Sequence, residues 1–351
     1  MPWWAWVWQA LALVIIGVRI ILGSGFPIAI AESVVLVGSV FAAVYHAEVV
    51  AHRVGEPLGS LVLAVAVTVI EVSLIISVTI PGGAETAGLA RDTVFSAVMI
   101  VCNGIVGLCL LAGGIRHREQ AFQMQGAQAA LSVLIALTTL TMILPNVTST
   151  TPGPTFSSAQ LVFVGIVSLA LYGSFLFVQT VRHREYFLAE TEEEGHAPPA
   201  KRVALMSTGL LFVSLVLVVA LAKMLTLPLE LLVAKAEAPR AVVGIVIAGL
   251  VLLPEGLASY RAAKANRLQI SMNLALGSVL ATIGLTIPAV AVVSLVLHHP
   301  LTLGLSAKEE LLLAVTLIVS LLTIGTGRTT VLQGLVHLVL FAVFLFLSLV
   351  P

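Results

Sequence analysis

Two carboxylates lie in the middle of long apolar stretches. Glu71 is at the centre of residues 65–80, and Glu255 directly follows Pro254 in a second stretch of the same kind. A charge at the centre of a bilayer costs at least about 2.5 kcal/mol, so an intramembrane carboxylate marks a candidate functional site. Pro254 also removes the helix hydrogen bond to the Leu250 carbonyl, which frees that oxygen for a cation. These residues indicate a site for a cation or a proton.

Neutral oxygens lie close to both carboxylates in the sequence. Thr68 shares a helix face with Glu71, and Ser259 shares one with Glu255. Such oxygens suit a hard cation such as Ca²⁺, which takes six to eight oxygen ligands, although each hydroxyl can equally bond a carbonyl of its own helix. The apolar segments that follow each carboxylate add further polar residues. The candidate cation ligands are Glu71, Glu255, Thr68, Asn103, Ser259, Asn273, Ser278 and Thr282.

Proton coupling is assigned to the same two carboxylates, with Glu48 as a further candidate on the proton path. Glu32 and Glu48 lie near predicted span ends, where a carboxylate can reach the interface. Only the second half of the chain has both a proline directly before its carboxylate and a full set of polar residues in the span that follows. We therefore expect Glu255 to be the better-liganded of the two central carboxylates.

The composition is that of a polytopic membrane protein. Of 351 residues, 59% are hydrophobic and 10% are charged, whereas about a quarter of the residues of a soluble domain are charged. The net charge is zero, so nothing indicates a nucleic-acid partner. Cys102 and Cys109 lie in an apolar segment and are interpreted as packing residues. No cofactor is expected, and the expected partners are the lipid bilayer and the transported ions, with a homo-oligomer left open.

About 20 apolar residues are needed for each membrane crossing. On this basis we predict eleven spans, with ten or twelve as alternatives, and the fold class is an all-α polytopic membrane protein. The predicted spans are residues 4–22, 26–49, 59–80, 91–114, 126–145, 158–181, 203–224, 240–262, 268–296, 308–325 and 329–350.

The distribution of Lys and Arg predicts the orientation. If the N-terminus is inside, eleven of these residues lie in inside loops and five in outside loops. We therefore expect a cytoplasmic N-terminus and an external C-terminus.

Similar sequence blocks precede the two carboxylates. Residues 48–57 precede the Glu71 stretch and residues 230–239 precede the Glu255 stretch, and both blocks have Glu first, a base sixth and Pro tenth. Glu71 is in the third predicted span and Glu255 in the eighth, so the two helices cross in opposite directions. This predicts an inverted repeat with an ion site at the midplane. The predicted units are an N-terminal helix (1–25), a first five-helix repeat (26–181), a cytoplasmic acidic linker (182–202) and a second five-helix repeat (203–351).

The linker carries an acidic run at Glu190, Glu192, Glu193 and Glu194. Charge runs are usually solvated, which favours a simple connection between the halves. A weak cation-collecting or regulatory surface is the alternative.

The chain resembles the calcium/cation antiporter superfamily, in its cation/proton exchanger branch. The resemblance rests on residues 47–61 with Glu71, and on residues 254–256 with residues 265–278, and it covers nearly the whole chain. It implies that Glu71 and Glu255 bind the cation and take up protons, in a bacterial inner membrane. The first half departs from the family pattern at residues 66–68 and 98–99, which leaves room for Na⁺ or K⁺.

These observations predict a secondary antiporter that exchanges cytoplasmic Ca²⁺ for external H⁺ by competition for Glu71 and Glu255. Two carboxylates in a low dielectric do not readily both ionise unless a cation neutralises them. The alternatives are a Na⁺(K⁺)/H⁺ antiporter with a less selective site and, from another class, a non-transporting membrane sensor or scaffold. An enzyme is not expected, because Asp92 is the single Asp and no Gly-x-Ser-x-Gly or metal-spaced His cluster occurs.

Overall fold

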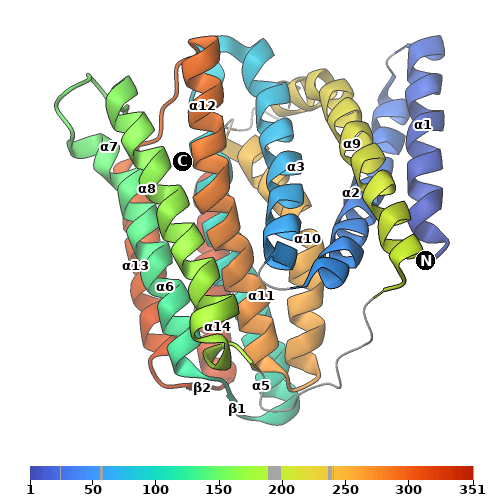
Figure 1. Cartoon of the computed structure of the whole chain (residues 1–351). Coiled ribbons are helices and arrows are strands. Elements are labelled where there is room, and N and C mark those ends of the chain that lie inside the picture. The colour runs from blue at the N-terminus through green and yellow to red at the C-terminus, as the bar shows by residue number, and fades with distance from the viewer. Residues whose placement is uncertain (24, 56–57, 189–198, 236–238, 240, 351) are drawn as a thin grey trace.

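A computed structural model shows that the protein is a bundle of long helices (Figure 1). The structure describes residues 1–23, 25–55, 58–188, 199–235, 239 and 241–350. The first half contains α1 (Trp4–Leu22), α2 (Phe26–Val54), α3 (Leu58–Gly82), α4 (Leu89–Met99), α5 (Val106–His117), α6 (Met124–Thr138), α7 (Leu144–Val147) and α8 (Ser158–Phe177). The second half contains α9 (Lys201–Lys235), α10 (Ala241–Lys264), α11 (Leu268–Ala281), α12 (Ile287–Leu297), α13 (Ala307–Ile324) and α14 (Val331–Leu349).

Short elements join or extend these helices. Within the described ranges, π-helices connect α4 to α5 (Ile100–Ile105), α6 to α7 (Thr139–Ile143) and α11 to α12 (Thr282–Thr286), and another extends α8 (Val178–Arg182). Two 3₁₀ turns cover Gly83–Thr86 and Arg184–Tyr186. Strands β1 (Gln120–Ala121) and β2 (Arg328–Thr329) form one small antiparallel pair.

The predicted all-α polytopic membrane fold is confirmed. Ten helical segments of the described chain are long and apolar enough to cross a membrane. The predicted span that is not among these ten, 308–325, corresponds to α13, whose 18 residues carry the charged side chains of Lys308, Glu309 and Glu310 in the first turn. α9 is longer than the predicted span 203–224, since it continues through Pro228 to Lys235. The acidic run at residues 190–194 lies outside the described residues.

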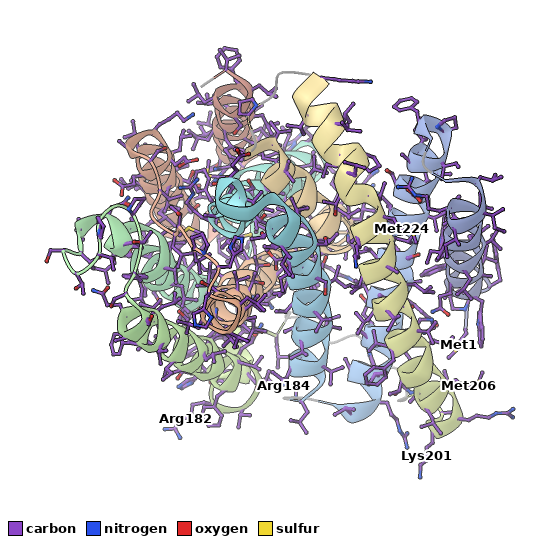
Figure 2. The ribbon with its side chains drawn as sticks, turned by 90° about the horizontal axis from the view of Figure 1, so that it is seen from above. Met1, Arg182, Arg184, Lys201, Met206 and Met224 are labelled. Atoms are coloured by element: carbon purple, nitrogen blue, oxygen red, sulfur yellow. The ribbon has the colours of Figure 1, made fainter. Side chains whose placement is uncertain are left out.

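The apolar side chains form two separate hydrophobic clusters. One combines α2, α3 and α9 with part of α1, and the other combines α4, α5, α6, α11 and α13 with their neighbours. α10 belongs to both clusters, because Ile247 and Val251 pack into the first while Ala248 and Leu252 pack into the second. α1 lies at the edge of the molecule, beside α2 and α9 (Figure 2). Each cluster contains helices of both halves of the chain, and the halves meet most extensively where α2 packs on α9, α5 on α14 and α4 on α10.

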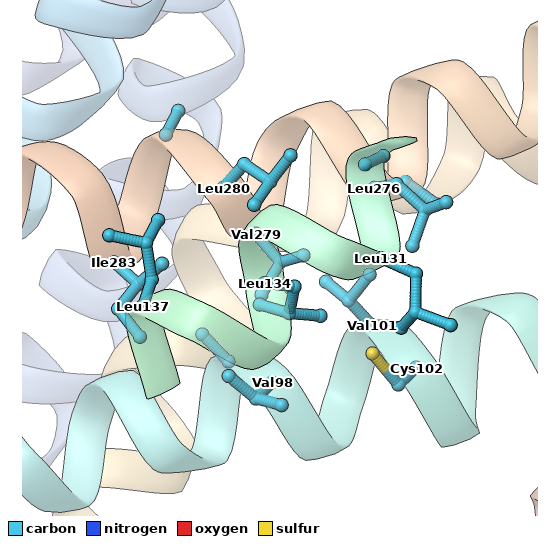
Figure 3. Packing of buried hydrophobic residues seen from close by; sticks show 14 of the residues in the cluster. Val98, Val101, Cys102, Leu131, Leu134, Leu137, Leu276, Val279, Leu280 and Ile283 are labelled. Carbon is cyan, nitrogen blue, oxygen red and sulfur yellow. The ribbon is translucent and has the colours of Figure 1, made fainter. Parts of the chain in front are cut away.

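α6 packs against α11, one of the helices that flank the π-helices. Leu131, Leu134 and Leu137 are each at most 1% exposed. They belong to one apolar cluster with Val98 to Cys102 and Leu276 to Ile283 (Figure 3). In this cluster α11 contacts the α4–α5 π-helix directly, and α4 contacts the α11–α12 π-helix.

The turns at one end of the bundle are tied together by polar contacts. β1 precedes α6 and β2 precedes α14, so their pairing joins the α5–α6 turn to the α13–α14 turn. The Gln120 side chain donates to the Ala263 carbonyl and to Asn266 Oδ1, both at 2.9 Å. These bonds add the α10–α11 turn to the same group.

Gly244 sets how closely α10 can approach α4, which gives a test of the fold. A Cβ at Gly244 would lie 2.8 Å from the carbonyl carbon of Asp92 and 2.8 Å from the backbone nitrogen of Thr93. We expect Gly244→Ala to destabilise the protein by about 1–3 kcal/mol, because rigid backbone must move. Thermal unfolding in detergent measures this effect. Gly249→Ala is the matched control in the same helix, since its Cβ would meet nothing within 4 Å; an equal loss in both variants would contradict the prediction.

Candidate cation and proton site

Glu71 is a buried carboxylate that is hydrogen-bonded by the opposite half of the chain. Its side chain lies near the middle of α3 and is 1% exposed. The Thr286 hydroxyl, from the α11–α12 π-helix, donates to Glu71 Oε2 at 2.8 Å. The Thr282 side chain, one turn earlier, also interacts with this carboxyl group. Two hydroxyls of the second half therefore face a carboxylate of the first half.

Glu255 is half-buried in α10 and lies within electrostatic range of two other carboxylates. It interacts electrostatically with both Glu71 and Glu48. Pro254 lies inside α10 and does not end the helix. Because proline has no backbone N–H, the Leu250 carbonyl lacks its helix hydrogen bond, as expected. Glu48, near the end of α2, is exposed. The structure thus brings the two central carboxylates into one neighbourhood and adds a third, more accessible one.

The expected asymmetry between the two carboxylates is wrong for the described residues. Glu71, not Glu255, receives the hydroxyls of the polar span that follows Glu255. The reason is that each carboxylate helix contacts the π-helix of the other half: α3 packs on Thr282–Thr286, and α10 packs on Ile100–Ile105. At Gly256, an added Cβ would lie 3.1 Å from Ile105, so an apolar side chain occupies this contact.

Three buried oxygens near the centre have no hydrogen-bond partner in the described part of the chain. They are Glu71 Oε1, Glu255 Oε2 and Ser259 Oγ. Leaving a buried polar group unsatisfied costs about 1–3 kcal/mol, and more for a charged group, so each such atom requires an explanation. Oxygens that lack protein donors can accept a proton or coordinate a cation.

Asn103, in the α4–α5 π-helix, belongs to a hydrogen-bond network with side chains of α13 and α14. Its amide nitrogen donates to Thr316 Oγ1 at 2.8 Å. Its amide oxygen is 3.1 Å from His337 Nδ1, so the imidazole donates here, and His337 Nε2 is 3.0 Å from the Thr323 hydroxyl. Asn103 and His337 are fully buried. The predicted ligand role of Asn103 would use its amide oxygen, which already accepts the hydrogen bond from His337.

Asn273 holds the beginning of the linker. Its amide nitrogen donates to the Phe187 carbonyl at 2.6 Å, and its oxygen accepts from Gln269. Gln269 also donates to the Tyr186 carbonyl and accepts from the Gln123 backbone. The described contacts of Asn273 are therefore at the start of α11, more than two turns before the threonines that face Glu71.

The remaining predicted residues have different surroundings. Thr68 donates to the Ala64 carbonyl of its own helix, at 2.8 Å. Ser259 is fully buried, and Ser278 is half-buried one turn before Thr282. Glu32 does not reach the interface as expected: it is fully buried, and its Oε1 lies 3.7 Å from Arg19 Nε.

Sequence reasoning missed Thr286, although a signal for it exists. Ser278, Thr282 and Thr286 recur every four residues in an apolar segment, which places three hydroxyls along one helix face. His337, with Thr316 and Thr323, was also missed. Its signal is weaker, because it is an isolated histidine within the apolar run of α14.

Comparisons with known proteins find a matching family and similar sequences. The sodium/calcium exchanger protein family matches residues 24–181 and 206–350. The y4hA protein of Sinorhizobium fredii is 49% identical over 357 residues, which cover 100% of this chain and 97% of that protein. The sodium-potassium/proton antiporter ChaA of Escherichia coli is 38% identical over 316 residues, which cover 88% of this chain and 85% of that protein.

Solved structures share the fold at much lower identity. The structure of native YfkE aligns with a TM-score of 0.76 at 15% identity, covering 99% of this chain and 100% of that one. The H⁺/Ca²⁺ exchanger CAX aligns with a TM-score of 0.71 at 16% identity, covering 97% and 87%. At these identities the likeness establishes the fold alone.

The Asn103–His337 bond can be tested by a double-mutant cycle. We expect Asn103→Leu and His337→Leu each to destabilise the protein by about 1–3 kcal/mol, because each leaves buried polar partners unpaired. The double variant should lose less than the sum, since the second change removes a group that has already lost its partner. Thermal unfolding of the four proteins in detergent gives the coupling. Strict additivity would mean that the two side chains do not interact.

Proposed function

The chain belongs to the sodium/calcium exchanger family, and we propose that it is a secondary antiporter that exchanges cytoplasmic Ca²⁺ for external protons. The observation that carries the proposal is that Glu71 and Glu255 lie within electrostatic range of each other, and each has a buried oxygen without a hydrogen-bond partner among the described residues. Family members are transporters, and the proposed exchange needs no cofactor.

Exchange follows from competition for these two carboxylates. Two like charges in a low-dielectric interior repel each other, so the doubly ionised pair is unfavourable by itself. One divalent cation, or two protons, neutralises the pair. A site that is stable only when neutralised cannot return empty across the membrane, and this requirement couples the cation to the protons.

The proposed cation ligands combine charged and neutral oxygens. Glu71 and Glu255 supply the charge, while Thr282 and Ser259 supply buried hydroxyls. Thr286 already orients Glu71 through its hydrogen bond and completes the set. Ser278 and the Leu250 carbonyl lie within about one turn of this group along their helices and are proposed to add oxygens, because Ca²⁺ takes six to eight. Thr68, Asn103 and Asn273 are left outside the set, because their polar atoms have other partners.

Glu48 is proposed to pass protons between Glu255 and water. It is exposed, it interacts electrostatically with Glu255, and it lies near the end of α2. The predicted orientation places this end in the cytoplasm. An exposed carboxylate beside a half-buried one provides a relay for protons and attracts cations to the site.

We also propose that residues 26–181 and 203–351 form two halves of inverted topology. The protein would lie in a bacterial inner membrane with its N-terminus in the cytoplasm. Support comes from the two separate segments that match the family, 24–181 and 206–350. Further support is the matched position of a π-helix in the span after each carboxylate helix. The ion site lies where such halves meet in secondary transporters.

A Na⁺(K⁺)/H⁺ antiporter is the second candidate. The E. coli relative at 38% identity is a sodium-potassium/proton antiporter. In addition, three of the predicted neutral ligands are engaged elsewhere, and a smaller oxygen set discriminates less strictly among cations. Proton flux in liposomes, measured separately with Ca²⁺, Na⁺ and K⁺, decides between the two candidates.

Neutralising either central carboxylate should abolish exchange. Glu71→Gln and Glu255→Gln keep the side-chain shape but remove the charge that the cation and protons share. We expect cation-dependent proton flux in everted vesicles to fall to background. Glu119→Gln is the control, because Glu119 is exposed and pairs with Arg328 at a turn of the bundle. Sustained Ca²⁺ uptake against a pH gradient by Glu71→Gln would refute the mechanism.

Thr286→Val should weaken cation binding without preventing folding. Valine preserves the volume of threonine but removes the hydroxyl that bonds Glu71. We expect the apparent KM for the cation to rise about tenfold, since hydrogen bonds to charged groups contribute about 1.5–3 kcal/mol. Thr286→Ser should restore most of the affinity. Thr138→Val is the matched control, because this buried hydroxyl bonds the Leu134 carbonyl of its own helix; the prediction fails if the two valine variants have the same KM.

A further inference from the structure

One cavity of the described chain is an apolar space whose lining residues include neighbours in sequence of the central carboxylates. It has a volume of about 470 Å³ and lies among α2, α3, α9 and α10, within the range of about 300–1,000 Å³ typical of ligand pockets. Its lining includes Leu74, three positions after Glu71, and Leu250, five positions before Glu255. From there it extends to the end of the bundle where α2 begins and α9 ends.

The mouth of the cavity faces the surroundings through large apolar side chains. Phe26, Ile30, Leu231 and Leu232 line it and are 72%, 52%, 54% and 56% exposed. In a membrane protein, such side chains at a span end contact lipid instead of water. The opening therefore faces the acyl chains of the bilayer.

Two cations lie at the same end of the cavity. Arg19 lines it from α1, one turn before that helix ends, and Lys235 lines it as the last residue of α9. Arg19 Nη2 donates to the Met224 carbonyl at 3.3 Å, and Nε lies 3.7 Å from Glu32 Oε1. Arg19 Nη1 is buried and has no partner in the described part of the chain. Glu32 compensates the charge of Arg19, and Lys235 is a second positive charge among the described side chains that line the cavity.

We propose that this cavity binds one anionic phospholipid of the bilayer. Its phosphate accepts hydrogen bonds from Arg19 Nη1 and lies near the Lys235 ammonium, while one acyl chain fills the apolar space down to Leu74 and Leu250. An unsatisfied guanidinium donor favours an oxygen acceptor, and arginine is suited to phosphate. An apolar channel of this kind favours a hydrocarbon chain over water. Charge and shape therefore select the same ligand class.

Lipid retention by the full-length protein tests the proposal. The purified protein in detergent is mixed with dioleoylphosphatidylglycerol or dioleoylphosphatidylcholine, which share their acyl chains, and bound lipid is counted by native mass spectrometry. We expect about tenfold preference for the anionic lipid, the size expected for cation–phosphate contacts at a membrane surface. Equal retention of the two lipids would overturn the proposal.

Matched variants separate the two parts of the ligand. Arg19→Gln alone would leave the buried Glu32 charge unpaired. The test therefore uses two separate variants: the double variant Arg19→Gln/Glu32→Gln, and Lys235→Gln, which changes an exposed side chain. Both should lose the anionic preference, whereas Arg116→Gln, an exposed arginine at the end of α5, should keep it. Ala29→Phe, which narrows the cavity, should reduce the retention of both lipids. A preference that survives in the Arg19→Gln/Glu32→Gln and Lys235→Gln variants contradicts the assignment.

Two further experiments test whether a soluble anion or water occupies the cavity instead of a lipid. Inorganic phosphate and glycerophosphoglycerol carry the anion without acyl chains, and neither should displace the bound lipid. Ser33 lines the cavity from an exposed position. In liposomes that contain the anionic lipid, Ser33→Cys should resist a water-soluble methanethiosulfonate. Displacement by the soluble anions, or rapid labelling, would show a phosphate pocket or a water-filled path and would refute the lipid site.

Discussion

The rest of the structure depends on the repulsion between two carboxylates that the protein keeps in its interior. Neither Glu71 nor Glu255 is paired with a basic side chain in the described part of the chain, although the buried Glu32 lies beside Arg19. The fold therefore has a compensated carboxylate at its edge and uncompensated ones at its centre. An uncompensated pair is costly unless protons or cations accompany it.

The position of this pair follows from how the hydrophobic core is divided. A single continuous core would bury both carboxylates among packed apolar side chains. Here α3 and α10 lie along the boundary between two clusters, and each contributes side chains to both. Polar atoms are less costly at such a boundary, because apolar packing is already interrupted. The crossed contacts, in which α3 packs on the α11–α12 π-helix and α10 on the α4–α5 π-helix, make the site a product of both halves.

The sequence predicted the fold well, because helices that cross a bilayer must be long, apolar and internally hydrogen-bonded. It singled out Glu71, Glu255, Ser259 and Thr282 as candidates for a related reason: polar residues are conspicuous in apolar segments. It could not tell which neighbours these residues have. Asn103 and Asn273 are as conspicuous as Thr282, but they bond His337 and Phe187, which are distant in sequence. The mistaken ranking of Glu255 over Glu71 has the same origin, since spacing along one helix says nothing about which helix lies opposite.

The π-helix at Thr282–Thr286 has a mechanical consequence. A π-turn contains one residue more than an α-turn, and this extra residue can move along a helix without changing the helix ends. Moving it by one position rotates the intervening residues by about 100° and shifts them by about 1.5 Å. Such a shift would carry the Thr286 hydroxyl away from Glu71 while α12 keeps its packing against α8. The oxygen set around Glu71 can thus be taken apart by a rearrangement of a single turn inside an otherwise stationary helix.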